Sequence, residues 1–355
     1  MKSILVKNGR VWDGYKFSYN DILVVEGIVS KIGTDLDFPN ALSFDASGMT
    51  VLPGLVDAHV HFCGPEPDQY GINPEMSCIP FGVTAAADAG GAHADLKLAS
   101  NFLVKNVTFV RVPIKDDEPD FTFTEKRISL YGSNVVGLKV YFDTNKPDVR
   151  SNHPLKKICE YAQAHNMKVM VHCSNSPSSM TEYLPLLSPG DILTHAFHGT
   201  LHNAREDRFK ALKEAQSRGI VIDTGFAGHI HTGLDVFKSA ISEGIVPDTI
   251  STDITRASAY HRGGRYGLTM CMSMARAAGM TEEDIFRAVT SKPARVLGKE
   301  NIWGVLKEGH CADITVLDYT TEGFTLQDRF GGSLNSDHGY RCKLTIANGI
   351  IVWRD

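Results

Sequence analysis

Two histidines, His59 and His61, close a mostly apolar segment that begins at Val51. An apolar run of this length predicts a β-strand, in which alternate side chains point to the same side. Both imidazoles therefore face one point at the end of the strand. Two neutral imidazoles on one side are typical ligands of a divalent metal ion. The spacing predicts a metal site more strongly than it predicts two packed histidines.

Lys139 stands in the middle of a second apolar run, residues 135–142. A lysine in a strand that is buried on both faces needs a reason, because burial disfavours the ammonium ion. The buried amine loses its proton readily. A neutral amine can add CO₂ to form a carbamate, whose two oxygens can bridge two metal ions. The alternative is a lysine whose ammonium group reaches solvent.

Three further candidate ligands also follow short apolar segments: His172, His195 and Asp253. A carboxylate at such a position can bind a metal ion and accept a proton from water. Taken singly, each histidine could be a core residue and Asp253 could cap a helix. Taken together, the two histidines indicate a second metal site next to the first.

The elements that must position these residues alternate between strands and helices. The candidate strands are residues 55–59, 84–88, 107–112, 137–141, 168–172, 191–195, 220–223 and 248–252. Helical patterns cover residues 153–165 and 203–218, and Thr281 opens a capping box for a helix that runs to Val289. Eight such units over about 250 residues predict an α/β fold, a (β/α)₈ TIM barrel with its functional residues at the carboxyl ends of the strands.

Both ends of the chain contain short alternating strands instead. They cover residues 3–7, 21–25 and 28–32 near the start, and 312–318, 343–348 and 350–353 near the end. Asn8-Gly9, Glu26-Gly27 and Asn348-Gly349 are typical hairpin turns. We therefore expect one small β-sandwich domain composed of residues 1–52 and 305–355, with the catalytic barrel of residues 53–304 inserted between its halves.

The composition narrows the class of protein. The chain has 355 residues, a net charge of −5, 43% hydrophobic and 22% charged residues, which is ordinary for a globular enzyme. The absence of a basic stripe argues against nucleic acid as a partner.

No apolar run reaches about 18 residues, so we expect no membrane span, and the first residues do not resemble a signal peptide. Seven cysteines without a Cys-x-x-Cys motif favour reduced thiols and a cytoplasmic location. Oligomeric state, including a homo-oligomer, is left open.

As a set, the strand-end residues resemble the amidohydrolase superfamily, in its binuclear branch with a carboxylated lysine. The resemblance covers almost the whole chain and includes residues 53–61, 82–84, 290–295 and 309–314. It implies two divalent ions, with Zn²⁺ favoured over manganese, iron or cobalt. His59, His61 and Asp253 would bind one ion, His172 and His195 the other, and Lys139, as N6-carboxylysine, would bridge both. The resemblance further implies metal-assisted hydrolysis in which Asp253 accepts a proton from activated water and passes it to the leaving group.

The substrate is less well determined. Cys63 stands where dihydroorotases usually carry an arginine, and residues 195–198 lack the His-x-x-Glu of mononuclear deaminases. Residues 171–177 and 189–195 resemble a bacterial dihydroorotase-like subgroup that includes deacetylases. We therefore predict cleavage of an amide or ester bond in a small acylated amino or hydroxy acid, or in a cyclic amide. The alternatives are an aminohydrolase (deaminase), a cyclic amidase of the dihydroorotase or dihydropyrimidinase type, and a non-catalytic scaffold.

Several groups beyond the strand ends are candidates for binding this substrate. They are Tyr141, His229, His231, Gly90, Gly91, Arg262 and Arg265. The tyrosine lies two residues beyond Lys139, and the glycines follow the second strand, where they can offer backbone N–H groups. The two arginines follow the eighth strand and predict a substrate that carries a carboxylate. The alternatives are core packing for the tyrosine, a simple turn for the glycines and solvated loop charges for the arginines.

Overall fold

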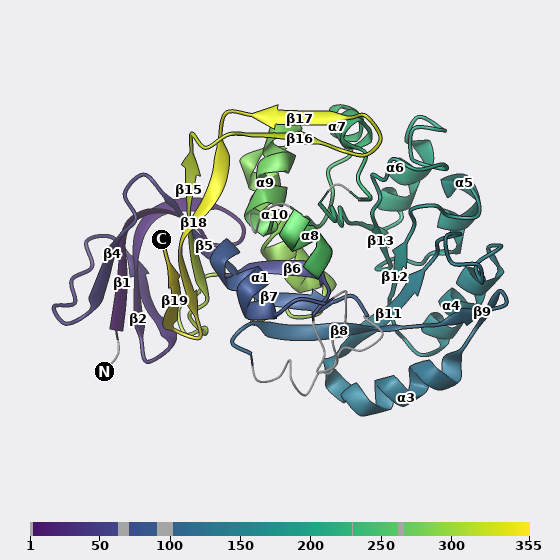
Figure 1. Ribbon diagram of the computed structural model, residues 1–355. Helices are drawn as coiled ribbons and strands as arrows, with labels where there is room; N and C mark the ends of the chain where they lie inside the picture. Colours follow the sequence, from purple (N-terminus) through teal and green to yellow (C-terminus); the bar gives the residue numbers. More distant parts are fainter. Residues whose placement is uncertain (1–2, 63–70, 91–101, 229, 262–265) are drawn as a thin grey trace.

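The computed structural model describes residues 3–62, 71–90, 102–228, 230–261 and 266–355. Strands from both ends of the chain form one sheet. The strand order is β19-β18-β15-β5-β1-β2-β3, with β4 paired to β1 (Figure 1). The strands are β1 (Ser3–Trp12), β2 (Phe17–Val25), β3 (Ile28–Gly33), β4 (Leu42–Asp45), β5 (Thr50–Pro53), β15 (Ile314–Thr320), β18 (Gly339–Ala347) and β19 (Ile350–Arg354). Where we expected a sandwich, the described strands form a single sheet, because β5 pairs antiparallel with β15 and joins the two halves edge to edge.

The turn predicted at Asn8-Gly9 is wrong, because this pair lies inside β1. The register between β1 and β2 shifts between Val6 and Gly9. Asn8 has a φ of 60° and donates its backbone N–H to Asp21 over 2.8 Å. This backbone makes a bulge, after which the strand continues. The hairpin itself lies at residues 13–16.

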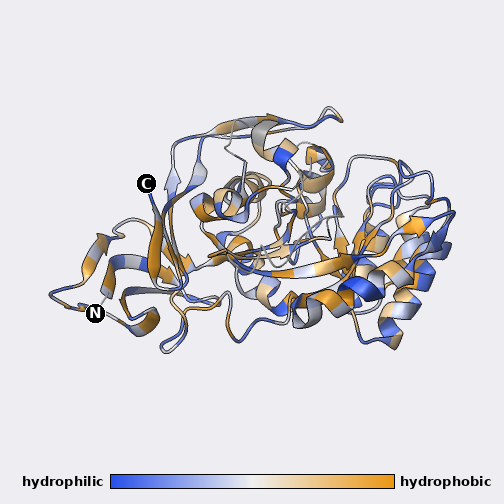
Figure 2. Cartoon of the chain, turned by 60° about the horizontal axis from the view of Figure 1, so that its bottom comes forward, coloured by the Kyte–Doolittle hydropathy of each residue, from blue (hydrophilic) through white to orange (hydrophobic). Residues whose placement is uncertain are grey.

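The middle of the chain forms a curved parallel sheet of seven strands, in the order β14-β13-β12-β11-β8-β7-β6. The strands are β6 (Leu55–Val60), β7 (Val83–Asp88), β8 (Lys105–Arg111), β11 (Val135–Tyr141), β12 (Val169–His172), β13 (Ile192–Thr194) and β14 (Val221–Ile222). Seven of the predicted strands therefore exist. Figure 2 shows these central strands largely in orange, the colour of hydrophobic residues.

The eighth predicted strand, residues 248–252, is not regular. This segment and the two residues after it make one parallel bridge to each edge of the sheet, Thr249 with Asp223 and Ile254 with Val60. Its side chains replace part of the ladder: the hydroxyls of Thr249 and Ser251 donate to Asp223 at 2.6 and 2.8 Å. Side-chain bonds of this kind compete with regular strand pairing. The segment thus lies between β14 and β6 without forming a continuous strand.

Helices pack around the parallel sheet. α4 (His153–Ala164) and α10 (Glu282–Ala288) agree with the prediction, and Thr281 caps α10 by accepting the N–H of Asp284 at 3.2 Å. The helix predicted over 203–218 is only α6 (Lys210–Ser217), because Arg208 and Phe209 adopt positive φ. The other elements are α1 (Pro74–Cys78), η1 (Ile79–Phe81), β9 (Ile114–Lys115), β10 (Glu118–Pro119), α3 (Phe121–Tyr131), η2 (Gly132–Asn134), α5 (Met180–Tyr183), η3 (Leu184–Leu186), α7 (Leu234–Ser242), α8 (Arg256–His261), α9 (Leu268–Ala277) and α11 (Ser291–Val296). Within the described ranges, no helix is both long and apolar enough to cross a membrane.

A hairpin of β16 (Phe324–Gln327) and β17 (Ser333–Ser336) leaves the terminal sheet and runs past α9 to α7 (Figure 1). Asp328 at its tip accepts the N–H of Leu234, the first residue of α7, at 2.6 Å. Phe330 covers Gly199 so closely that a Cβ on this glycine would lie 2.3 Å from its ring. The last part of the chain therefore packs on loops at the carboxyl ends of the parallel strands.

Candidate metal centre

The first predicted group, His59, His61 and Asp253, comes together at the end of β6. The two histidines are alternate residues, and Asp253 reaches them because its N–H bonds to the carbonyl of His59 at 2.7 Å. Asp253 Oδ1 lies 3.2 Å from His59 Nε2 and 2.9 Å from His61 Nε2. All three side chains are buried. Three atoms that can donate a lone pair thus converge within 4.8 Å of one another, which is the donor set of a divalent cation.

The second group contains His172 and His195, as predicted, and also His231. His172 ends β12 and His195 follows β13, and their ring centroids are 4.4 Å apart. The centroid of His231 lies 4.8 Å from that of His172 and 4.3 Å from that of His195. We expected His231 to bind the substrate rather than a metal ion. The structure brings it among the candidate ligands instead.

The two groups are contiguous. Asp253 Oδ2 lies 3.8 Å from His195 Nε2 and 3.9 Å from His231 Nε2, so one carboxylate faces both groups. The rings of His59 and His195 have centroids 5.2 Å apart. A single buried centre therefore contains both predicted ligand sets.

Lys139 points into this centre from β11. Its Nζ lies 3.2 Å from His59 Nε2 and 3.5 Å from Met170 Sδ, and the side chain has no exposed surface. The ammonium group therefore does not reach solvent. Among the described residues, none of the ion pairs within 4.0 Å involves Lys139, although Asp253 and Asp223 are near enough to act on its charge. Burial lowers the pKa of Lys139 to about 8, against the opposing pull of these carboxylates.

Hydrogen bonds behind the ligands indicate which histidine nitrogens face the centre. His195 Nδ1 lies 2.6 Å from the carbonyl of Gly225, which only accepts, so Nδ1 carries the proton. The hydroxyl of Thr194 donates to Asp223 at 2.7 Å and therefore accepts from His59 Nδ1 at 2.8 Å. In the neutral form of both histidines, Nε2 is therefore the unprotonated nitrogen, and it faces the centre. This is the usual way in which an outer partner orients a metal-binding histidine.

The charges of the group also suit metal binding. Burial lowers the pKa of His172, moves that of His195 well below its usual range, and lowers that of His231 to about 3, so these rings are neutral. Burial opposes ionisation of Asp253, but His59 and His61 outweigh it and hold the pKa of this carboxyl well below normal. Burial and Lys139 oppose protonation of His59, whereas Asp253 and Asp223 raise its pKa overall. Neutral imidazoles and an ionised carboxylate are the forms that bind metal, so His59, whose raised pKa favours its charged form, has to give up a proton when a metal ion binds.

Two of the predicted ligands have an unusual backbone. His195 has a φ of 59° and Asp253 a φ of 47°, a left-handed conformation that residues other than glycine rarely adopt. Strain of this kind persists where the surrounding structure enforces it and is common at functional sites. In both cases the turn directs the side chain inward at the end of a strand-like segment.

The predicted substrate-binding residues have different outcomes. Tyr141 lies beside the centre, with its ring centroid 5.6 Å from that of His172. Gly90 donates its N–H to Asp88 at 2.8 Å, so this amide serves a turn in the structure. A Cβ on Gly90 would lie 2.8 Å from the Phe109 carbonyl oxygen, which explains the glycine by close approach. Four predicted residues lie outside the described ranges: Gly91, His229, Arg262 and Arg265.

Sequence reasoning missed the residues that support the ligands. Asp223 accepts hydrogen bonds from Thr194, Thr249 and Ser251. The available signal was its place at the end of the predicted strand 220–223, which matches the place of Asp253. Ser174 was missed as well, although it follows His172 by two residues; its Oγ lies 2.6 Å from His172 Nε2 and 3.0 Å from His231 Nδ1.

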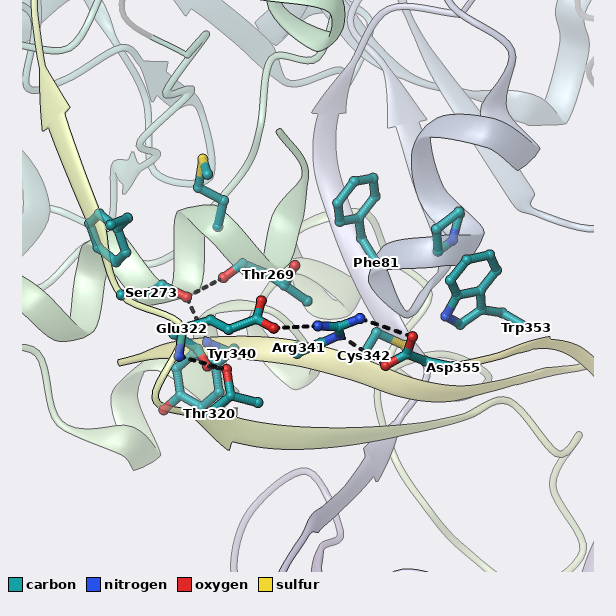
Figure 3. A pocket seen from close by; sticks show the side chains of 15 residues that line it. Phe81, Thr269, Ser273, Thr320, Glu322, Tyr340, Arg341, Cys342, Trp353 and Asp355 are labelled. Carbon is teal, nitrogen blue, oxygen red and sulfur yellow. Dashed lines mark hydrogen bonds and ion pairs between the residues drawn. The ribbon is translucent and has the colours of Figure 1, made fainter. Parts of the chain in front are cut away.

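A cavity of about 410 Å³ lies elsewhere, lined by residues of α9, η1, β15, β18 and β19 (Figure 3). Arg341 runs along its wall, with Nη1 2.6 Å from Glu322 Oε1 and Nε 2.9 Å from Asp355 Oδ2. These charges pair with each other and leave no convergent set of lone pairs. The candidate metal ligands therefore lie at the histidine centre and not in this cavity.

Comparison with known proteins agrees with this geometry. The sequence model of the Amidohydrolase family matches residues 50–351, and the chain belongs to this family, whose members are metal-dependent hydrolases. A curated relative, a deacetylase of Brucella anthropi, is 30% identical to this chain over 339 residues. The alignment covers 88% of this chain and 82% of the relative.

Two solved structures share the fold over 100% of both chains. One is described as a dihydroorotase, with 25% identity and a TM-score of 0.88, and the other as an adenine deaminase, with 24% identity and a TM-score of 0.86. The protein is thus a hydrolase of the amidohydrolase superfamily. Because one fold carries three differently named activities, the fold alone does not select the substrate.

Proposed function

We propose that this protein is a binuclear metallohydrolase that cleaves the acyl amide or ester bond of a small acylated amino or hydroxy acid, or of a cyclic amide. The observation that carries the proposal is the pair of contiguous ligand groups that face one carboxylate, Asp253, beside the fully buried Lys139. The deacetylase relative supports the choice of an acyl bond.

The donor atoms fit two divalent cations. His59, His61 and Asp253 would hold one, and His172 and His195 the other, with His231 available to the second group. Nitrogen and oxygen donors of this kind favour Zn²⁺. When bound, two divalent ions lower the pKa of water and polarise an acyl carbonyl.

Asp253 is the residue that would move the proton. Its lowered pKa keeps the carboxylate ionised, which a proton acceptor must be, and its Oδ2 is turned toward His195 and His231. It can accept a proton on this oxygen and return it to the leaving nitrogen or oxygen of the substrate. The burial of the whole group keeps bulk water from competing for that proton.

Lys139 is proposed to be carboxylated. The side chain is buried and lacks an ion-pair partner among the described residues, and its pKa of about 8 leaves roughly one amine in ten neutral at pH 7. The neutral amine can attack CO₂, and loss of a proton then gives an anionic carbamate. An anion at this position would face the cations that the two ligand groups hold.

We further propose a closed barrel, a composite terminal domain and a cytoplasmic location. Residues 249–254, which bridge both edges of the parallel sheet, would complete a (β/α)₈ barrel within residues 53–304. Residues 1–52 and 305–355 would form the composite domain beside it. The six described cysteines are free and five of them are buried, which is in keeping with the cytoplasm.

The test is a substrate panel on protein loaded with zinc in the presence of bicarbonate. The panel contains N-acyl amino acids, O-acyl hydroxy acids, cyclic ureides and purines. We expect about two metal ions per chain by elemental analysis and release of a carboxylic acid from an acylated substrate. Ammonia release from purines would favour the aminohydrolase, and ring opening alone would favour the cyclic amidase. Fully metal-loaded protein without turnover of any compound would overturn the proposal in favour of a scaffold.

A further inference from the structure

A cation lies beside the candidate metal centre at the carboxyl end of the third parallel strand. Arg111 is the last residue of β8 and is paired in register with Lys139 on β11. Its guanidinium carbon lies 5.2 Å from the ring centroid of Tyr141, and the Tyr141 ring centroid lies 5.6 Å from that of His172. One aromatic ring therefore separates the guanidinium group from the second histidine group.

The fold does not pair this guanidinium group as it pairs the half-buried cation at the start of the same strand. The Nε atom of Arg111 is buried, and among the described residues Arg111 has neither a hydrogen-bond partner for this atom nor an ion pair. By contrast, Lys105 at the start of the same strand is paired with Asp313 at 2.6 Å. A buried donor without a partner is unfavourable and rare in folded proteins. It needs an explanation outside the contacts of the folded chain.

The backbone of Arg111 is held in place, although its guanidinium group forms no ion pair with the residues that the structure describes. Thr124 donates its hydroxyl to the backbone carbonyl of Arg111 at 3.3 Å. A Cβ on Gly90 would lie 3.1 Å from Arg111 N and 3.1 Å from Lys139 Cβ, so the ends of three strands are packed against one another here. The carboxylate of Asp88, on the neighbouring strand, accepts the N–H groups of Phe62 and Gly90 and forms no ion pair with Arg111. The arginine is thus held in place beside the centre.

We infer that Arg111, held against Tyr141, binds the carboxylate of the substrate. This inference rests on the proposed function and narrows it to acylated acids. A guanidinium group offers two parallel N–H donors that match a carboxylate, and stacking on an aromatic ring orients the plane of the group. Because Arg111 and the histidines are separated by a single ring, the carboxylate and the acyl carbon of the substrate lie close together. This spacing suits an α-acylamino or α-acyloxy acid, whereas purines and neutral ureides have no group for Arg111 to bind.

The experiment compares one substrate with its neutral analogue. The best acylated acid from the panel and its primary amide are assayed with the zinc-loaded parent, Arg111→Met and Arg111→Lys. Arg276→Met is the matched control, since this half-buried arginine also stacks on a tyrosine, Tyr319, at 6.0 Å, but in the contact between α9 and the terminal sheet. We expect Arg111→Met to raise KM for the acid roughly 10–100-fold, the loss of a charge-assisted hydrogen bond, and to leave KM for the amide within about twofold. Arg111→Lys should lie between, and Arg276→Met should match the parent.

The outcomes separate the inference from the proposed function. If the parent hydrolyses neither compound, the proposed function fails. If the parent is active and Arg111→Met weakens the acid and the amide equally, Arg111 has only a structural role and the inference is overturned. Melting temperature and metal content are measured for every variant. Should Arg111→Met not fold, the ratio of acid to amide KM in Arg111→Lys decides the question in the same way.

Discussion

Thr194 should control the affinity of the centre for metal, although it binds no metal itself. Its hydroxyl gives its one proton to Asp223 and so must accept the proton of His59 Nδ1, so that in the neutral imidazole Nε2 is the unprotonated nitrogen and faces Asp253. Thr194→Val has the same shape but lacks this acceptor. Asp223 keeps its bonds from Thr249 and Ser251, so the surrounding network should survive.

The size of the effect follows from two alternatives that are open to His59 in the variant. If Nδ1 keeps its proton, a buried N–H is left without a partner, which costs about 1–3 kcal/mol. If the proton moves to Nε2, the ring no longer offers a lone pair to the metal. Loss of an outer partner typically weakens metal binding by about 10–100-fold, which corresponds to roughly 1.4–2.7 kcal/mol. Thr194→Ser keeps the hydroxyl and should stay within about threefold of the parent.

The assay is a competition for zinc between each protein and a chromophoric chelator of known affinity, at fixed pH and bicarbonate. We expect one of the two binding steps to weaken in Thr194→Val and neither of them to change in Thr194→Ser. Thermal melting of the metal-free proteins separates loss of affinity from loss of fold. Equal zinc affinities for the parent and both variants would refute the assigned tautomer of His59 and its role in binding.

Three further predictions concern the same centre. Asp253→Asn should keep the fold by circular dichroism but lower kcat by about 10²–10⁴-fold; kcat within twofold of the parent would place the base elsewhere. Because burial lowers the pKa of Lys139 to about 8, the neutral amine increases about tenfold per pH unit below that value and levels off above it. The rate at which zinc activates the metal-free protein, at constant dissolved CO₂, should therefore increase about tenfold from pH 6.5 to 7.5. Lys139→Ala should be inactive until a short carboxylic acid is added. A flat pH profile or an active Lys139→Ala would contradict carboxylation. Gly90→Ala should lower the free energy of unfolding in urea by more than Gly244→Ala does. Both glycines have positive φ, but a Cβ at Gly90 would lie 2.8 Å from a carbonyl oxygen, whereas nothing lies within 4 Å of a Cβ at Gly244. Equal losses would show that the close approach is relieved at no cost.

The sequence was sufficient for the regular part of the centre. Alternation along a strand places His59 and His61 on one side whatever the rest of the chain does, and parallel strands bring their carboxyl ends to one edge. His172 and Lys139 follow from the same two rules, whereas Asp253 follows residues 248–252, which do not form a regular strand. These residues could be predicted because the period of a strand is local and because alternating strands and helices favour parallel strands.

The remaining residues depend on contacts between distant segments. His231 is in an irregular loop, and it reaches the centre because its carbonyl accepts the N–H of Gly199 and its ring meets Ser174. Arg111 looks like an ordinary charged strand end until its register with Lys139 is known. Residues 248–252 have the composition of a strand, but Asp223 draws their hydroxyls into side-chain bonds. No local pattern encodes such pairings, because each requires a partner that is far away in the sequence.

The joining of the two chain ends in one sheet has a consequence for biosynthesis. Pro53 on β5 pairs with Ile314 on β15, so this edge of the first strands has no neighbour until most of the polypeptide has been translated. At about 5–20 residues per second the ribosome needs on the order of 10–50 s to reach β15. During that interval the unpaired edge is a template for aggregation, and pairing across such a long loop is slow. The nascent chain should therefore be most dependent on chaperones before its last strands emerge, and a stop codon after residue 313 should yield aggregated protein even though every candidate metal ligand is present.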